Sequence, residues 1–151
     1  MKITPRRLKF GLNIWFPFKF TGIKVLEIKD DWTYAKVRLK RSWYNQNAVG
    51  THYGGSLFSM TDPFYMLMAF YQIGKDYIVW DKKAEIKFIK ATKKDVFAEY
   101  HLPQETLNDW KEQLKTTDKI EPIFEVDIKD AEGNMIAKVW KTLYIANKDK
   151  K

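Results

Sequence analysis

The chain has 151 residues, a length that suits one domain built around a single hydrophobic core. Hydrophobic residues make up 45% of the chain and charged residues 30%, a composition that excludes an intrinsically disordered protein. Cysteine is absent, which excludes disulfides and thiolate chemistry. The chain has only two histidines, His52 and His101, so it holds no histidine-rich metal cluster, and we expect no bound metal.

The formal net charge of +8 is concentrated near the N-terminus. Residues 1–41 hold eleven Lys or Arg and three acidic residues, whereas residues 42–151 hold sixteen of each. A basic surface of this kind can bind nucleic acid, an anionic membrane or a phosphate-bearing small molecule, or it can simply be a solvated face. Aromatic residues near these basic residues could stack on nucleotides, although we interpret the aromatic residues as part of the core. They are Trp32, Tyr34, Trp43 and Tyr44.

No apolar stretch approaches the roughly 20 uncharged residues of a membrane-spanning helix. The segment FGLNIWFPF weakly resembles a signal peptide, but Asn13 and Pro17 interrupt it and no small-residue cleavage site follows. We therefore expect a cytoplasmic protein without a membrane span.

The first third of the chain is expected to hold a helix and two strands. Thr4 as N-cap and Pro5 at the first helical position predict a helix over residues 5–15. The segment PFKFTGIKVLEI, residues 17–28, leads into a strand. The alternating apolar and basic residues of YAKVRLKRSW, residues 34–43, are typical of a strand with one solvated face.

A loop over 45–50 precedes an apolar run over residues 54–72, which we interpret as one long helix. Because this helix is apolar on nearly every side, it is expected to be enclosed. The following segment, DYIVWDKKAEIKFI over 76–89, begins as a continuous apolar strand and then alternates.

The C-terminal half continues with strands and one short helix. DVFAEYHL, residues 95–102, alternates, and a helix beginning after Pro103 carries an apolar face of Leu107, Trp110 and Leu114. Residues 122–146 form a hairpin with its turn at Gly133–Asn134. The order of elements predicts an α+β fold, in which a six-stranded, mainly antiparallel sheet curves around one long buried helix.

Gly54 and Gly55 stand where the loop meets the predicted helix. The first backbone N–H groups of a helix lack internal partners and carry partial positive charge, and glycine lets a substrate carbonyl approach them closely. The pair therefore suits an oxyanion hole, although two glycines can also simply form a turn.

Asp62 is the only acidic or basic residue between Gly55 and Lys75. In a buried helix, desolvation would raise its pKa and make it a candidate general base. Asp followed by Pro63 is also a favourable helix start, with Asp62 as N-cap, and this interpretation implies a break in the helix. The two interpretations are compatible, since a break would direct Asp62 into a cleft.

Three further residues are candidates for a polar site. His52 could be a general base, an oxyanion donor or a ring positioned by the loop, and Asn47 could orient a water molecule or support a turn. Asp81, between Trp80 and Lys82, forms an adjacent opposite-charge pair with Lys82 that we place at a strand end. His101 stands at a polar strand position and is interpreted as a surface residue.

Two segments resemble a known family. GTHYGGSLFSMTDPFYML, residues 50–67, and YIVWDKKAEIKF, residues 77–88, are similar to the pattern of hotdog-fold acyl-CoA thioesterases, in a branch usually filed as a domain of unknown function and also named tetrameric acyl-CoA thioesterase. The resemblance covers essentially the whole chain and implies a single hotdog domain over residues 1–151. In this pattern Tyr53 stands where the thioesterases have histidine, and His52 comes one position earlier.

The resemblance implies a role for each matching residue. An amide of Gly54 or Gly55 would polarise the thioester carbonyl, Asp62 would activate water or attack directly, and Asn47 would position water or that carboxylate. His52 is kept as a further catalytic candidate. Coenzyme A, as part of the substrate, is the only cofactor-like group expected, and its binding is assigned to these residues: Thr51, Tyr53, Tyr65, Trp80, Asp81, Lys82 and Lys90.

The family also implies a homodimer or homotetramer whose pocket lies between subunits. The leading hypothesis is hydrolysis of an acyl-CoA thioester. The alternative is a hotdog module that binds an acyl chain or lipid without turnover, which Tyr53 in the usual histidine position supports. Nucleic-acid binding by the basic N-terminal third is a less favoured alternative.

Overall fold

A computed structural model describes residues 3–148. Within this range the helices are α1 (Pro5–Ile14), α2 (Phe16–Thr21), α3 (Gly54–Ser59), α4 (Phe64–Ile73) and α5 (Gln104–Thr116). The strands are β1 (Ile23–Ile28), β2 (Tyr34–Leu39), β3 (Tyr77–Phe88), β4 (Val96–His101), β5 (Lys119–Ile120), β6 (Ile123–Asp130) and β7 (Met135–Asn147).

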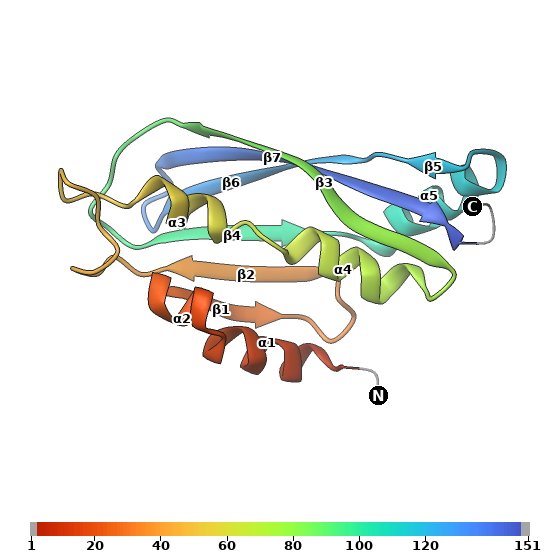
Figure 1. The fold of residues 1–151 in the computed structure, drawn as a ribbon, viewed down its shortest axis with the longest axis horizontal. Coiled ribbons are helices and arrows are strands. Elements are labelled where there is room, and N and C mark those ends of the chain that lie inside the picture. The colour runs from red at the N-terminus through yellow and green to blue at the C-terminus, as the bar shows by residue number, and fades with distance from the viewer. Residues whose placement is uncertain (1–2, 149–151) are drawn as a thin grey trace.

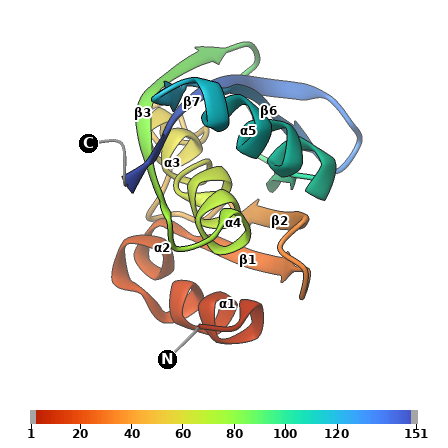
Figure 2. The same ribbon diagram turned by 90° about the vertical axis from the view of Figure 1, so that its right-hand side faces the viewer.

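Seven strands form one antiparallel sheet in the described part of the chain, with the order β1-β2-β4-β6-β7-β3 and the short β5 paired to β7. Figures 1 and 2 show the sheet curving around α4, with α1 and α2 below its β1 end. The predicted α+β hotdog fold is confirmed. The two-residue β5 was not predicted, because it is too short to show alternation.

Alternating hydrophobicity identified several elements correctly. In β4 the alternate residues Val96, Ala98 and Tyr100 are buried, as the pattern predicted. The face of α5 formed by Leu107, Trp110 and Leu114 is also buried. The β6–β7 hairpin turns at Gly133, whose φ of 85° is readily adopted only by glycine.

The N-terminal region contains one helix more than the sequence predicted. α1 begins as expected, with the Thr4 hydroxyl accepting a hydrogen bond from the Arg7 amide at 3.3 Å. Residues 17–21, which we expected to lead into a strand, belong instead to α2. Pro17 is in the first turn of α2, where its missing N–H has no cost, and Gly22 ends the helix with a φ of 83°.

The central helix is interrupted, as one of the two interpretations of Asp62 implied. α3 ends at Ser59 and α4 begins at Phe64. The buried Tyr100 hydroxyl donates a hydrogen bond to the carbonyl oxygen of Met60 in the break, at 2.8 Å. The Asp62–Pro63 peptide bond is cis. Pro63 occupies the N-cap position of α4 and no side chain caps that helix, so the prediction that Asp62 is its N-cap was wrong.

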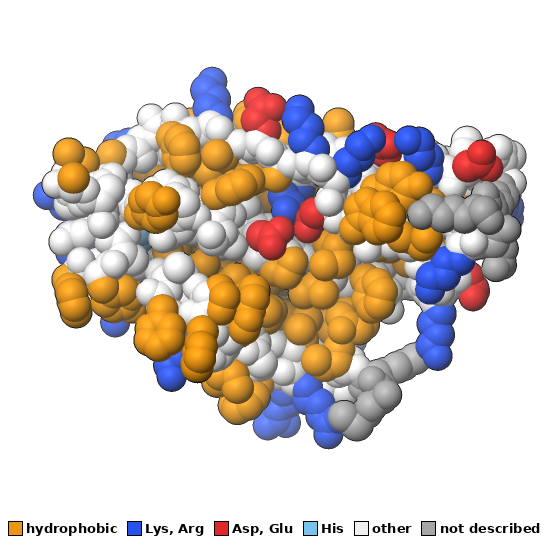
Figure 3. Space-filling model, in the orientation of Figure 1, with side chains coloured by type: hydrophobic (Ala, Val, Ile, Leu, Met, Phe, Trp, Pro, Cys, Tyr) orange, Lys and Arg blue, Asp and Glu red, His pale blue; other side chains and the backbone are white. Residues whose placement is uncertain are grey.

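The expectation of a wholly enclosed helix was also wrong. Phe58 on α3 and Phe70 on α4 are exposed, and Figure 3 shows many hydrophobic side chains on this face. The 12-residue strand β3, at one end of the strand order, borders the same face. Within residues 3–148, no helix is long and apolar enough to cross a membrane.

The hydrogen bond into the helix break makes a prediction about stability. Replacing Tyr100 with Phe leaves the Met60 carbonyl buried without this donor, so we expect the free energy of unfolding to fall by about 1–3 kcal/mol. Urea denaturation of the variant and the wild type measures the change. The exposed Tyr44→Phe is the matched control, expected to stay within about 0.5 kcal/mol of the wild type. An equal effect of both substitutions would contradict the role of this bond.

Candidate functional site

Two carboxylates and one ammonium group meet at the break between α3 and α4. The Lys141 ammonium on β7 lies 2.9 Å from Oδ1 of Asp62 and 3.1 Å from Oδ1 of Asp81 on β3. The arrangement joins the helix break to two neighbouring strands of the sheet. In Figure 3, acidic and basic side chains appear at this break within a largely hydrophobic face.

The three side chains differ in exposure. The Lys141 side chain is 3% exposed, that of Asp81 25% and that of Asp62 59%. Burial raises the pKa of Asp81 above its ordinary value, the Lys141 ammonium opposes this rise, and the nearby Asp62 carboxylate adds to it. We expected burial to desolvate Asp62, but it desolvates Asp81 instead, and the Asp62 carboxylate faces solvent.

These residues line a depression with a volume of about 500 Å³. Lys82 also lines it, and its ammonium lies 2.7 Å from a carboxylate oxygen of Glu121. The prediction that Asp81 pairs with Lys82 at a strand end was wrong. Asp81 lies within β3, beside an irregularity where the pairing with β7 shifts, and its partner is Lys141.

Sequence reasoning missed Lys141. The pattern of β7 held a usable signal, since Val139, Lys141 and Leu143 alternate on the buried side of the strand. A lysine in register with buried residues must find an anionic partner, because a lone buried charge is very unfavourable. That signal would have predicted a buried ion pair on β7, although not which acids form it.

Five of the predicted site residues lie together in a second cavity of about 340 Å³: Asn47, Thr51, His52, Gly54 and Lys90. Phe88, at the end of β3, lines it as well. Because α3 begins at Gly54 and ends before Asp62, this six-residue helix separates the predicted oxyanion donors from the predicted base. On one chain, therefore, the two halves of the predicted catalytic site occupy different cavities.

His52 and Asn47 are tied into the loop before α3. Nε2 of the buried His52 lies 2.7 Å from the carbonyl oxygen of Lys94, and burial lowers the pKa of the imidazole. The Asn47 amide donates to the Thr51 hydroxyl and accepts from the Thr51 backbone N–H. These contacts support a structural role for both side chains in the loop, and a direct part in chemistry stays a prediction.

Both glycines are closely approached by aromatic rings. A β-carbon on Gly54 would lie 2.9 Å from Cζ of Phe88, and one on Gly55 would lie 2.4 Å from Cε1 of Tyr53. Neither position has room for a side chain without movement of a ring. The exposed Tyr53 ring therefore covers part of the first turn of α3, where an oxyanion would have to bind.

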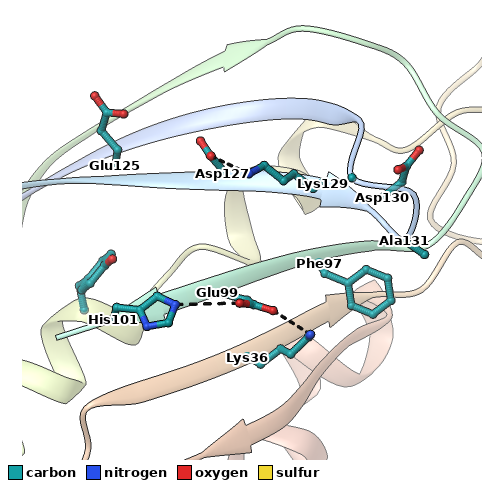
Figure 4. Close-up of a pocket in the computed structure, with 11 residues that line it drawn as sticks. Lys36, Phe97, Glu99, His101, Glu125, Asp127, Lys129, Asp130 and Ala131 are labelled. Atoms are coloured by element: carbon teal, nitrogen blue, oxygen red, sulfur yellow. Dashed lines mark ion pairs between the residues drawn. The ribbon is translucent and has the colours of Figure 1, made fainter. Parts of the chain in front are cut away.

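Tyr65 lies in a third cavity, of about 690 Å³, rather than with Asp62. This cavity opens where β4 and β6 diverge, and Figure 4 shows charged side chains along its two sides. The Tyr65 ring stacks on Phe124 with a centroid distance of 4.0 Å, and burial raises the pKa of its hydroxyl. Trp80, half exposed on β3, stacks on Tyr144 at 4.7 Å.

Comparison with known protein families shows which family the chain belongs to. Residues 5–145 match the family described as "Domain of unknown function (DUF4442)", and the chain belongs to this family. The comparison with curated proteins gave no match.

Solved structures show the same fold at low identity. A protein of unknown function from Pseudomonas aeruginosa, also called a "Probable Thioesterase", has a TM-score of 0.83 and 17% identity, over 97% of this chain and 98% of its own. A thioesterase from Haemophilus influenzae has a TM-score of 0.68 and 12% identity, over 98% and 94%. A protein of unknown function from Chlorobaculum tepidum has a TM-score of 0.72 and 16% identity, over 95% and 97%. The chain thus shares the fold of thioesterases.

Replacing Lys141 with Met tests the central ion pair. The substitution leaves the Asp81 carboxylate partly buried without its cation, so we expect the free energy of unfolding to fall by about 2–3 kcal/mol at pH 7. This fall is smaller than for a fully buried ion pair, because Asp62 is solvated. The pKa of Asp81 is already raised in the folded protein. Asp81 therefore destabilises the folded protein increasingly as the pH rises from its pKa in the unfolded chain, near 3.8, through its higher pKa in the folded protein.

The pH dependence separates this effect from simple loss of packing. Without Lys141 the pKa of Asp81 should rise further. The loss of unfolding free energy in Lys141→Met, relative to the wild type, should therefore be small at pH 4 and largest near pH 7. Urea denaturation at both pH values measures it. Lys87→Met, at an exposed position of the neighbouring strand β3, is the control. A deficit that does not change with pH would contradict the electrostatic explanation.

Proposed function

We propose that the protein is a thioester hydrolase acting on an acyl-CoA-type substrate, with Asp62 as the base or nucleophile. The supporting observation is the solvent-facing Asp62 carboxylate, fixed at the break of the central helix by the buried ammonium of Lys141. A carboxylate held in one position and open to a cavity suits both roles. The shared fold with thioesterases agrees with this class of reaction.

In the proposed reaction, Asp62 removes a proton from a water molecule whose oxygen adds to the thioester carbonyl carbon. The amide of Gly54 or Gly55 stabilises the resulting oxyanion. The oxyanion then collapses, the carbon–sulfur bond breaks, and the proton taken by Asp62 passes to the departing thiolate. The products are a carboxylic acid and a free thiol. Lys141 acts by positioning the Asp62 carboxylate.

A second copy of the chain would complete this site. Gly54 and Asp62 of one copy line different cavities, and residues of β3 line both. β3 lies at one end of the sheet, where its outer edge can pair with another strand. Pairing two copies along β3 would bring Asp62 of one copy towards Gly54 of the other and would cover the exposed Phe58. Basic residues near both cavities, such as Lys83 and Lys90, then suit the phosphates of coenzyme A.

We therefore expect a homo-oligomer, either a dimer or a tetramer. Light scattering at micromolar concentration should give a mass at least twice the 18.0 kDa of one chain. The physical reason is that β3 ends the strand order among residues 3–148, with exposed aromatic residues beside it. A monomer across the accessible concentration range would exclude the shared site.

The Asp62→Asn substitution tests the proposed chemistry. It keeps the size of the side chain but removes its ability to accept a proton, so hydrolysis should fall by at least ~10²-fold. Thiol release from a panel of acyl-CoA substrates is the measurement. The exposed Asp76→Asn is the control and should keep full activity. Thermal unfolding of both variants verifies that they are folded, and an active Asp62→Asn variant would exclude the catalytic role.

A specific observation favours a second candidate, a module that binds an acyl chain or lipid without hydrolysis. The Tyr53 ring lies against Gly55 and limits access to the amides proposed as oxyanion donors. If the wild type releases no thiol from any acyl-CoA but binds a non-hydrolysable analogue, this function replaces the first. Comparison with Tyr53→His then shows whether the ring alone blocks turnover.

A further inference from the structure

The two N-terminal helices expose an unusual number of large hydrophobic side chains. Five of them, between 49% and 69% exposed, lie within eleven residues: Phe10, Ile14, Trp15, Phe16 and Phe20. The opposite sides of these helices are anchored, since Leu12 and Phe18 are buried in the core. The exposure is therefore a property of one outward face rather than of loose helices.

The segment after β2 adds to this face. Trp43 and Tyr44 are exposed, which corrects the expectation that they belong to the core. The neighbouring Asn45 amide donates to the carbonyl oxygen of Thr21 at 2.8 Å, so this segment lies against the C-terminal end of α2. We call the five helical side chains together with Trp43 and Tyr44 the aromatic surface. Figure 3 shows hydrophobic side chains gathered over α1 and α2, with basic but no acidic side chains beside them.

The charge on the two helices of the aromatic surface has one sign. α1 and α2 carry Arg6, Arg7, Lys9 and Lys19, and the first acidic residue of the chain is Glu27. Arg6, Arg7 and Lys19 are exposed, whereas the Lys9 ammonium donates to the carbonyl oxygen of Leu26. Exposed aromatic and aliphatic side chains flanked by basic ones characterise helices that lie in a membrane interface.

We propose that the aromatic surface docks the protein on the surface of an anionic lipid bilayer. The apolar side chains would enter the boundary between headgroups and acyl chains, and the basic side chains would lie among the lipid phosphates. Neither contribution gives firm attachment alone, and this face supplies both. The proposal is independent of hydrolysis at Asp62.

Two other occupants fit less well. Two copies meeting through this face would place like charges opposite one another, which opposes a symmetric interface. Single-stranded nucleic acid is bound by aromatic rings whose faces are open for bases to stack on. Phe16 and Phe20 instead contact each other, with ring centroids 5.5 Å apart, and Ile14 offers nothing for a base to stack on. An apolar face with a basic border matches a lipid surface better than either.

Vesicle co-sedimentation tests the proposal. The full chain should bind vesicles of phosphatidylcholine mixed with phosphatidylglycerol, and bind vesicles of phosphatidylcholine alone much more weakly. Added salt should weaken the binding. The charge variant, which removes three basic residues, should have a binding constant roughly 100-fold lower, at about fivefold for each charge. Its substitutions are Arg6→Gln, Arg7→Gln and Lys19→Gln. The matched control removes three lysines elsewhere, Lys75, Lys87 and Lys111, and should lower binding far less.

The apolar contribution is tested separately. Phe16→Ser combined with Phe20→Ser should weaken binding at least ~10-fold, because two side chains no longer enter the bilayer. Ile123→Ser, at an equally exposed residue of β6, should leave binding unchanged. Phe10→Ser serves in place of the double variant if thermal unfolding shows that the latter does not fold.

Each contrary outcome overturns the proposal. Failure of the wild type to bind anionic vesicles does so, as does equal binding by the variants and their controls. A fall in the light-scattering mass of the Phe16→Ser, Phe20→Ser variant would assign the face to contacts between copies. The wild type could instead bind single-stranded RNA but no vesicles, with RNA binding lost in the charge variant. That result would assign the aromatic surface to nucleic acid.

Discussion

The buried ammonium of Lys141 is the constraint on which the candidate site depends. It lies in the middle of β7, in register with Val139 and Leu143, where an unpaired charge would be very costly. Asp81 meets this need from β3, and Asp62 meets it from the break in the central helix. One cation thus links the edge strand to the interrupted helix, and it sets the position of Asp62, the more exposed of the two carboxylates.

Much of the fold could be predicted because most strands alternate strictly. β4 and the face of α5 follow directly from the spacing of their apolar residues. α2 could not be predicted, because it has only six residues and depends on Gly22 and on packing against residues distant in sequence. Trp43 was misjudged for a related reason: burial of an aromatic residue depends on what covers it, and periodicity carries no information about that.

The candidate site was predicted in part. The position of Asp62 at a helix break followed from the Asp-Pro pair, but its supposed cap did not exist, because its carboxylate is directed to Lys141. The ion pair between Asp81 and Lys141 was not predicted, because the two residues are 60 positions apart in sequence, beyond the reach of local charge patterns. Sequence also could not separate Gly54 from Asp62, since closeness along the chain does not require a shared cavity.

The divergence of β4 and β6 has a mechanical consequence. These strands pair over only three residues each, from Val96 to Ala98 and from Ile128 to Asp130, whereas β3 and β7 pair along nearly their whole length. The sheet therefore consists of two well-paired parts, which we call plates: β1, β2 and β4 form one, and β6, β7 and β3 form the other. They are joined by a short seam of three residue pairs. Beyond the seam the Tyr65 ring bridges them, touching Tyr100 on one plate and Phe124 on the other. A change in the angle between the plates would act first on Tyr65, and through α4 on the turn that holds Asp62.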